Sequence, residues 1–146
     1  RKKGPVRSKK VTVDGIQFAS GLEAYMYKAL KKAKIKADYE KRTFELWRGF
    51  YFPDKSYERQ ANGKGEMVNR GDKKILGIKY TPDFEGKDFI IECKGRPNET
   101  FPLRWKMFKK YVRENLFGYT LYKPQKQSEC DMVVKLIKNK HKWQEE

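Results

Sequence analysis

The segment KYTPDFEGKDFIIECKG, from Lys79 to Gly95, contains three residues whose combination favours chemistry on phosphate: Asp83, Glu92 and Lys94. Two carboxylates that reach one point offer hard oxygen ligands, which suit Mg²⁺ or Mn²⁺ and leave positions open for water and a phosphate oxygen. A nearby ammonium can orient or help deprotonate an attacking water and offset charge on the reacting phosphate. The pattern therefore predicts a site for metal-assisted hydrolysis.

A hairpin would bring these residues together. If residues around 85–88 form the turn, with Gly86-Lys87 at its tip, Asp83 lies opposite Ile90 and Glu92 is its diagonal neighbour, at a Cα separation of about 7–8 Å. Lys94, two residues after Glu92, then points to the same face. The other parity is apolar and predicts a buried face, made of Phe84, Phe89, Ile91 and Cys93.

The setting of the motif decides its meaning, because an acidic residue followed two positions later by lysine is common in this chain. The same pattern occurs at Asp72/Lys74 and at Glu85/Lys87. The copy at Glu92/Lys94 follows Phe89-Ile90-Ile91, and charges appended to a buried strand cost free energy unless they have partners or a function. We therefore favour a functional site over a solvated strand end.

The elements that would position these residues follow from hydrophobic periodicity and turn signals. The sequence predicts a hairpin over 11–18, a helix from Ser20 to about Lys34, a strand over Tyr39–Trp47, strands over about 75–83 and 88–94, a helix over about 102–115, a strand over 119–122, and a last helix that starts near Ser128 and fades after Ile137. The order αβββαβα predicts an α/β fold with a mixed central sheet flanked by helices. Residues 1–10 form a basic arm, and residues 11–146 form a single domain with an insertion at about 48–74.

The motifs also resemble those of a known family, the PD-(D/E)xK nuclease superfamily, and within it the phage endonuclease I type Holliday-junction resolvases. Four segments carry the resemblance in the family's order: Phe18 to Glu23 opening a helix, Ile35 to Glu40 entering a strand, Tyr80 to Phe84, and Glu92 to Gly95. The resemblance covers roughly residues 11 to 122. It implies the PD-(D/E)xK core and a Mg²⁺-dependent phosphodiesterase, with Mn²⁺ as a substitute.

The resemblance further implies which residues act. Glu23, Asp83, Glu92 and the backbone carbonyl of Cys93 would bind the metal, and Lys94 would complete the catalytic set. Glu23 also has a structural interpretation, because Ser20-Gly21-Leu22-Glu23 has the pattern of a capping box, in which Ser20 accepts from the Glu23 N–H. The two roles are compatible, and we expect Glu23 to bind metal.

Asp38 and Glu40 leave a choice open. The resolvases carry a further acidic residue at the start of this strand, and an ungapped count from Glu23 reaches Asp38, with Glu40 on the same face two residues later. A solvated charge at the strand edge explains Asp38 equally well. Neither residue is therefore assigned to catalysis.

The formal charge of +16, from 35 Lys and Arg against 19 Asp and Glu, predicts a polyanionic partner, most commonly nucleic acid. Residues of the basic arm and those just after the motif are the candidates for phosphate contacts. They are Lys2, Lys3, Arg7, Lys9, Lys10, Arg96, Arg104, Lys106, Lys109 and Lys110. For any single lysine of this set, an ordinary solvated helix face remains the alternative.

Several classes of function are disfavoured. The chain shows no apolar run of about 20 residues, so we expect no membrane partner. Two cysteines and one histidine provide neither a disulfide framework nor a zinc site, which is typical of an intracellular, cytoplasmic protein. Phosphate-binding glycine loops of the nucleotide-dependent enzymes are absent from the sequence, so we expect no nucleotide cofactor.

The sequence thus predicts a metal-dependent, structure-specific DNA endonuclease, most simply a Holliday-junction resolvase acting on branched or four-way DNA. Two nicks at related positions favour a homodimer, with the first hairpin and Phe50-Tyr51-Phe52 as the candidate interface. The alternatives are another PD-(D/E)xK nuclease, of a restriction-like, transposase-associated or end-processing type, and a catalytically silent nucleic-acid-binding module.

Overall fold

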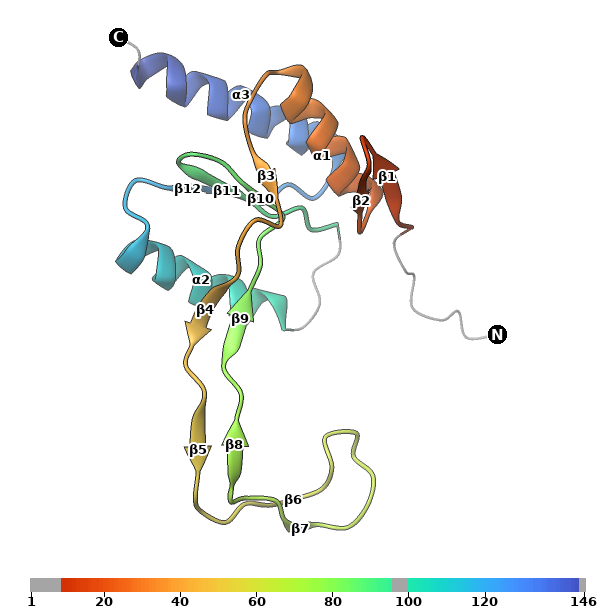
Figure 1. The fold of residues 1–146 in the computed structure, drawn as a ribbon, viewed down its shortest axis with the longest axis vertical. Helices are drawn as coiled ribbons and strands as arrows, with labels where there is room; N and C mark the ends of the chain where they lie inside the picture. Colours follow the sequence, from red (N-terminus) through yellow and green to blue (C-terminus); the bar gives the residue numbers. More distant parts are fainter. Residues whose placement is uncertain (1–8, 96–99, 145–146) are drawn as a thin grey trace. The chain divides into compact units, whose positions relative to one another are not determined.

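The computed structural model describes residues 9–95 and 100–144 of the chain (Figure 1). These residues form two compact units. The first unit combines Arg1–Arg42 with Thr81–Glu146, and the second is the intervening segment Thr43–Tyr80. The predicted insertion at 48–74 falls inside the second unit.

The first unit begins with a small hairpin of β1 (Val11–Val13) and β2 (Ile16–Phe18). Asp14 and Gly15 form its turn with φ angles of 51° and 76°. Positive φ at both central residues of a two-residue turn is the reason why Asp-Gly is favoured there. The hairpin predicted over residues 11–18 is confirmed.

The centre of the first unit is a four-stranded mixed sheet in the order β12-β11-β10-β3. Its strands are short: β3 (Asp38–Tyr39), β10 (Phe84–Glu85), β11 (Phe89–Ile91) and β12 (Thr120–Tyr122). The β3/β10 and β10/β11 pairs are antiparallel, and the β11/β12 pair is parallel.

Three helices complete this unit: α1 (Gly21–Lys32), α2 (Phe101–Asn115) and α3 (Gln127–Gln144). In Figure 1, α1 and α3 lie on one side of the sheet and α2 on the other. After the first hairpin, the elements of this unit follow the order αβββαβα. The mixed α/β class predicted from the sequence is confirmed.

One continuous core lies between the sheet and the helices α1 and α3. It contains the buried side chains of the predicted apolar parity, and these pack with residues of β2 and both helices. The main contributors are Phe18, Met26, Leu30, Phe84, Phe89, Ile91, Cys93, Cys130, Val133 and Ile137. On α2, the buried residues recur at helical spacing, at Phe101, Trp105, Phe108 and Val112.

The turn between β10 and β11 differs from the sequence prediction by one residue. The Gly86 N–H donates to the Phe89 carbonyl at 3.0 Å, so the tip is Lys87-Asp88 rather than Gly86-Lys87. The reason is steric, because the Phe89 ring occupies the space of the missing Gly86 side chain, where a Cβ would lie 2.2 Å from ring carbons. The shift changes every cross-strand pair of the motif.

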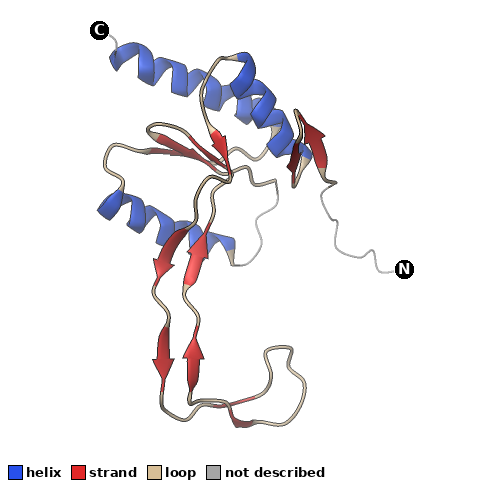
Figure 2. Cartoon of the chain, in the orientation of Figure 1, coloured by secondary structure: helices blue, strands red, loops and turns tan. Residues whose placement is uncertain are grey.

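The second unit consists of antiparallel strand pairs, as the red arrows of Figure 2 show. They are β4 (Phe44–Trp47) with β9 (Ile78–Tyr80), β5 (Phe50–Phe52) with β8 (Lys73–Ile75), and β6 (Tyr57–Glu58) with β7 (Val68–Asn69). Between the first two pairs, Gly49 and Gly77 approach so closely that a Cβ on Gly49 would lie 2.8 Å from the Gly77 nitrogen. We call this unit the ribbon.

Three predicted elements have wrong boundaries. The strand predicted over about 75–83 is interrupted, because β8 ends at Ile75, β9 ends at Tyr80 and Asp83 precedes the start of β10 at Phe84. The strand predicted over Tyr39–Trp47 is two strands in different units, because Glu40 adopts a φ of 47° that ends β3. The last helix does not fade after Ile137 but continues to Gln144, since Lys140 and His141 bond to Asp88 at 3.1 and 3.2 Å and hold its final turns. No helix in the described part of the chain is long and apolar enough to cross a membrane.

Candidate metal centre

Three acidic residues, Glu40, Asp83 and Glu92, lie side by side at the ends of the neighbouring strands β3, β10 and β11. We call these three residues the acidic row. The register pairs Phe84 with Tyr39 on one side and with Ile91 on the other, so the preceding residue, Asp83, lies opposite both Glu40 and Glu92. The Glu40 N–H donates to the Asp83 carbonyl at 2.8 Å, which continues the ladder to this row. Glu92 is therefore directly opposite Asp83, not its diagonal neighbour as predicted.

Glu23 reaches this row from the first turn of α1. Ser20 is the N-cap of α1, and its hydroxyl accepts from the Glu23 N–H at 3.2 Å. The Glu23 carboxylate accepts from the Ser20 hydroxyl through Oε2 and from the Tyr39 hydroxyl through Oε1, each at 2.8 Å. The predicted cap is present, and the same contacts fix the orientation of a carboxylate that is only 6% exposed.

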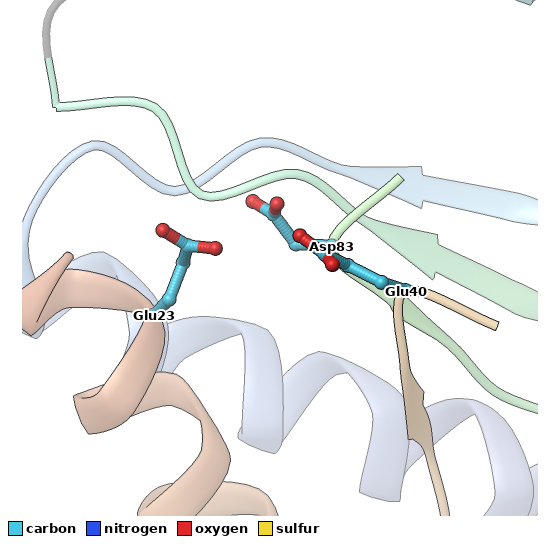
Figure 3. A group of neighbouring side chains, drawn as sticks. All are labelled: Glu23, Glu40 and Asp83. Atoms are coloured by element: carbon cyan, nitrogen blue, oxygen red, sulfur yellow. The ribbon is translucent and has the colours of Figure 1, made fainter. Parts of the chain in front are cut away.

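Carboxylate oxygens of Glu23, Glu40 and Asp83 lie within 4.8 Å of one another. Figure 3 shows Glu23 on α1 with its carboxylate directed toward Asp83 and Glu40. Two oxygens bound to one Mg²⁺ ion lie about 3 Å apart in neighbouring positions and about 4.2 Å apart in opposite ones, so rotation of these side chains would bring the triad onto one cation. An all-oxygen donor set fits Mg²⁺ or Mn²⁺ better than zinc.

The electrostatics of Asp83 fit a site built for a cation. Burial, the charges of Glu92 and Glu23, and a hydrogen bond with the Glu92 carboxyl raise the pKa of Asp83 well above its usual range. Only the Cys93 N–H, which donates to Asp83 Oδ2 at 2.8 Å, acts in the opposite direction. A divalent cation would remove the repulsion that raises this pKa.

Tyr39 is an anchoring residue of the cluster. Burial and the hydrogen bond to Glu23 raise the pKa of the Tyr39 phenol, so it remains a neutral donor. Its ring packs edge-on against Phe18, with ring centroids 4.6 Å apart. The aromatic core of the first unit thus orients Glu23 through a single hydroxyl.

Lys94 lies at the same end of the sheet. Its Nζ is 4.5 Å from the centroid of the Phe101 ring, in cation–π contact. Lys94 also lines a hollow of about 640 Å³ together with Glu23, Cys93 and Lys9. The hollow is large enough for a nucleotide-sized group, and it opens beside the acidic row.

The predicted phosphate-binding residues divide into three groups. Lys9 lines the hollow beside Glu23, and Lys10 lines a shallower one with Tyr39 and Glu40. On α2, Arg104 is half-buried, whereas Lys106, Lys109 and Lys110 are exposed, and Lys109 lines a different hollow with Arg113 and Leu121. The remaining four lie outside the described residues: Lys2, Lys3, Arg7 and Arg96.

The structure also brings in a residue that the sequence left unassigned. Glu40 belongs to the triad, whereas Asp38 lies in the row of Glu85 and forms an ion pair with Lys41 at 3.6 Å. The alternation of side chains puts Asp38 and Glu40 on one face, but only the register with Asp83 distinguishes them. The metal roles of Glu23, Asp83, Glu92 and the Cys93 carbonyl stay predictions.

A family model described as "Protein of unknown function (DUF1064)" matches residues 3–129. The matched region includes the triad, Glu92 and Lys94. Neither the curated proteins nor the solved structures contain a match to the chain.

Proposed function

The chain belongs to the DUF1064 family of proteins of unknown function, and we propose that it is a metal-dependent endodeoxyribonuclease that hydrolyses phosphodiester bonds. The observation that carries the proposal is the convergence of Glu23, Glu40 and Asp83, with Glu92 opposite Asp83, in a strongly basic protein. Carboxylates gathered beside a basic surface repel a bound phosphate unless a cation lies between them.

The residues of the cluster have distinct roles in this proposal. Glu23, Glu40, Asp83 and Glu92 hold Mg²⁺ or Mn²⁺, which supplies a Lewis acid for the phosphate and lowers the pKa of an attacking water. Lys94 orients that water and offsets charge on the phosphate, at a position fixed by the Phe101 ring. Lys9 and Lys10 hold the DNA backbone next to the cluster.

The finer proposal concerns the substrate. The resemblance to PD-(D/E)xK resolvases supports branched DNA, and paired nicks in a four-way junction favour a homodimer. A PD-(D/E)xK nuclease of another type would instead depend on sequence or on DNA ends. A silent binding module would not need the acidic cluster, because carboxylates weaken the binding of phosphate.

Synthetic duplex, nicked, flapped and four-way DNA, each incubated with Mg²⁺, Mn²⁺ or a chelator, test these statements together. We expect metal-dependent cutting, fastest on the four-way junction, and a dimer in sedimentation with junction DNA. Equal rates on linear and branched DNA, or a strict monomer, would remove the resolvase assignment and leave the nuclease. Binding without any cutting in either metal would overturn the nuclease proposal.

A further inference from the structure

A lysine, Lys123, lies next to the acidic row, directly after β12. In the parallel β11/β12 pair, Ile91 is the partner of Tyr122, so Lys123 follows as the neighbour of Glu92. The ladder persists beyond the strands, because the Glu92 N–H donates to the Tyr122 carbonyl at 2.9 Å and the Lys94 N–H to the Pro124 carbonyl at 3.0 Å. Paired residues of neighbouring strands project to the same face.

Lys123 and Lys94 share one aromatic support. The Lys94 Nζ lies 4.5 Å from the Phe101 ring centroid, and the Lys123 Nζ lies 5.9 Å from the same centroid and 5.9 Å from that of Trp105. Phe101 and Trp105 are themselves stacked, with centroids 5.8 Å apart. Two ammonium groups therefore converge on one buried aromatic pair at the end of the acidic row.

Like charges at one place repel each other unless an anion lies between them. The ion pairs among the described residues involve neither Lys94 nor Lys123. Lys123 is exposed, and its ammonium lies 5.9 Å from both ring centroids of the aromatic pair. Cation–π contact holds the charges in place without neutralising them, which leaves their hydrogen-bonding capacity to a ligand.

We propose that Lys94 and Lys123 form a phosphate-binding site, in which Lys123 holds a non-bridging oxygen of the DNA phosphate that Lys94 and the acidic row act on. The assignment of the phosphate to DNA rests on the proposed function, whereas the site for a phosphate group does not. Lys123 is a binding residue, and it limits the orientations that the phosphate can take relative to Glu92.

A titration with inorganic pyrophosphate tests the site without metal or DNA. The full chain, labelled with ¹³C at the lysine ε-carbons, should show saturable shifts of the Lys94 and Lys123 signals. Lys123→Gln should weaken pyrophosphate binding about 10-fold or more, as expected for a charged hydrogen bond, and Lys123→Arg should restore it. The matched control is Lys126→Gln, an exposed lysine three residues later, which should bind like the wild type.

Unmoved Lys123 signals, or equal losses in Lys123→Gln and Lys126→Gln, would overturn the site and show only diffuse attraction to the basic surface. A second measurement follows the binding of DNA in Ca²⁺ at several salt concentrations. Lys123→Gln should make the negative slope of log K against log salt less steep by about 0.9, and Lys126→Gln should leave it unchanged. If the wild type neither binds nor cuts DNA, the proposed function fails, and the pyrophosphate titration still decides the site.

Discussion

The two units of this protein differ in how far they bury their aromatic side chains. In the first unit, the rings of Phe18, Phe84, Phe89 and Phe108 are at most 2% exposed. In the ribbon, Phe50, Tyr51 and Tyr57 are 46%, 57% and 61% exposed. Helices on both faces of the sheet cover the first set of rings, whereas the layer of paired strands leaves most of the ribbon's rings exposed and buries Phe44 and Tyr80, which are cross-strand partners in the β4/β9 pair.

The acidic residues follow the same division. Glu23, Glu85 and Glu92 of the first unit are 5–7% exposed, whereas all five acidic residues of the ribbon are exposed. Among the buried three, Glu85 has a cation, because Arg42 lies 2.9 Å from its carboxylate. Glu23 and Glu92 both lie next to another acid, Asp83. Burial next to like charge is costly, and the metal site proposed for the first unit would offset that cost.

The largest expected effect distinguishes a buried from an exposed glutamate. Glu92→Gln should reduce cleavage in Mg²⁺ by about 10³-fold or more while DNA binding stays equal or improves, because a ligand charge that repels phosphate is removed. Glu45→Gln, the matched change in the ribbon, should leave cleavage within a factor of about three. Loss of binding together with cutting in the Glu92 variant would make this residue structural.

Two glycine substitutions sharpen the comparison. Gly86→Ala should cost about 2–3 kcal/mol of unfolding free energy, because the new methyl overlaps the Phe89 ring, and it should weaken Mn²⁺ binding by moving the register of Asp83 and Glu92. Gly49→Ala meets the Ile75 carbonyl at 2.6 Å and should loosen the ribbon alone. Chemical denaturation and Mn²⁺ titration of both variants measure this. Equal losses of Mn²⁺ affinity would contradict the separation of the units.

A smaller effect concerns pH. The folded state raises the pKa of Asp83, so the folded Asp83 carboxyl keeps a proton that the unfolded chain releases above about pH 4. The metal-free protein therefore loses stability as the pH rises from about 4 toward the raised pKa. Asp83→Asn should therefore stabilise the metal-free protein at pH 7 by about 1–2 kcal/mol, and by nothing near pH 3. Asp54→Asn in the ribbon is the control, and a destabilised Asp83→Asn would refute the account of the cluster.

The smallest effect concerns the last turns of α3. Burial of the Asp88 carboxyl would raise its pKa, but the hydrogen bonds from His141 and Lys140 outweigh burial and lower this pKa. This stabilisation is present above about pH 4 and disappears as pH falls through the lowered pKa. Asp88→Asn should cost less than about 1 kcal/mol at neutral pH and nothing at pH 2, measured by thermal unfolding. A pH-independent loss would assign Asp88 a purely steric role.

Local patterns were sufficient to predict most elements. The Asp14-Gly15 turn, the capped start of α1 and the apolar parity of the motif strands depend on neighbouring residues, and each is present as expected. Asp83 and Glu23 also lie together, as the family resemblance implied. The phosphate contacts of all ten basic residues remain predictions, and four of these residues lie outside the described part of the chain.

The wrong predictions concern features that depend on one contact or one backbone angle rather than on the pattern of neighbouring residues. The turn register depends on the Phe89 ring against Gly86, and the choice of Glu40 over Asp38 depends on which of them pairs with Asp83. The division of the strand predicted over Tyr39–Trp47 depends on the positive φ of Glu40, which is uncommon for a glutamate. None of these contacts leaves a signal in hydrophobic periodicity, which reports faces rather than partners.

The central claim, that the acidic row of the first unit holds a divalent cation, can be tested most directly by electron paramagnetic resonance of Mn²⁺ titrated into the full chain. We predict saturable binding by the wild type and by Glu45→Gln, weaker binding by Glu40→Gln, and loss of binding by Asp83→Asn. Mn²⁺ affinity that is unchanged in Asp83→Asn and Glu40→Gln, or no saturable binding by the wild type, would contradict the claim.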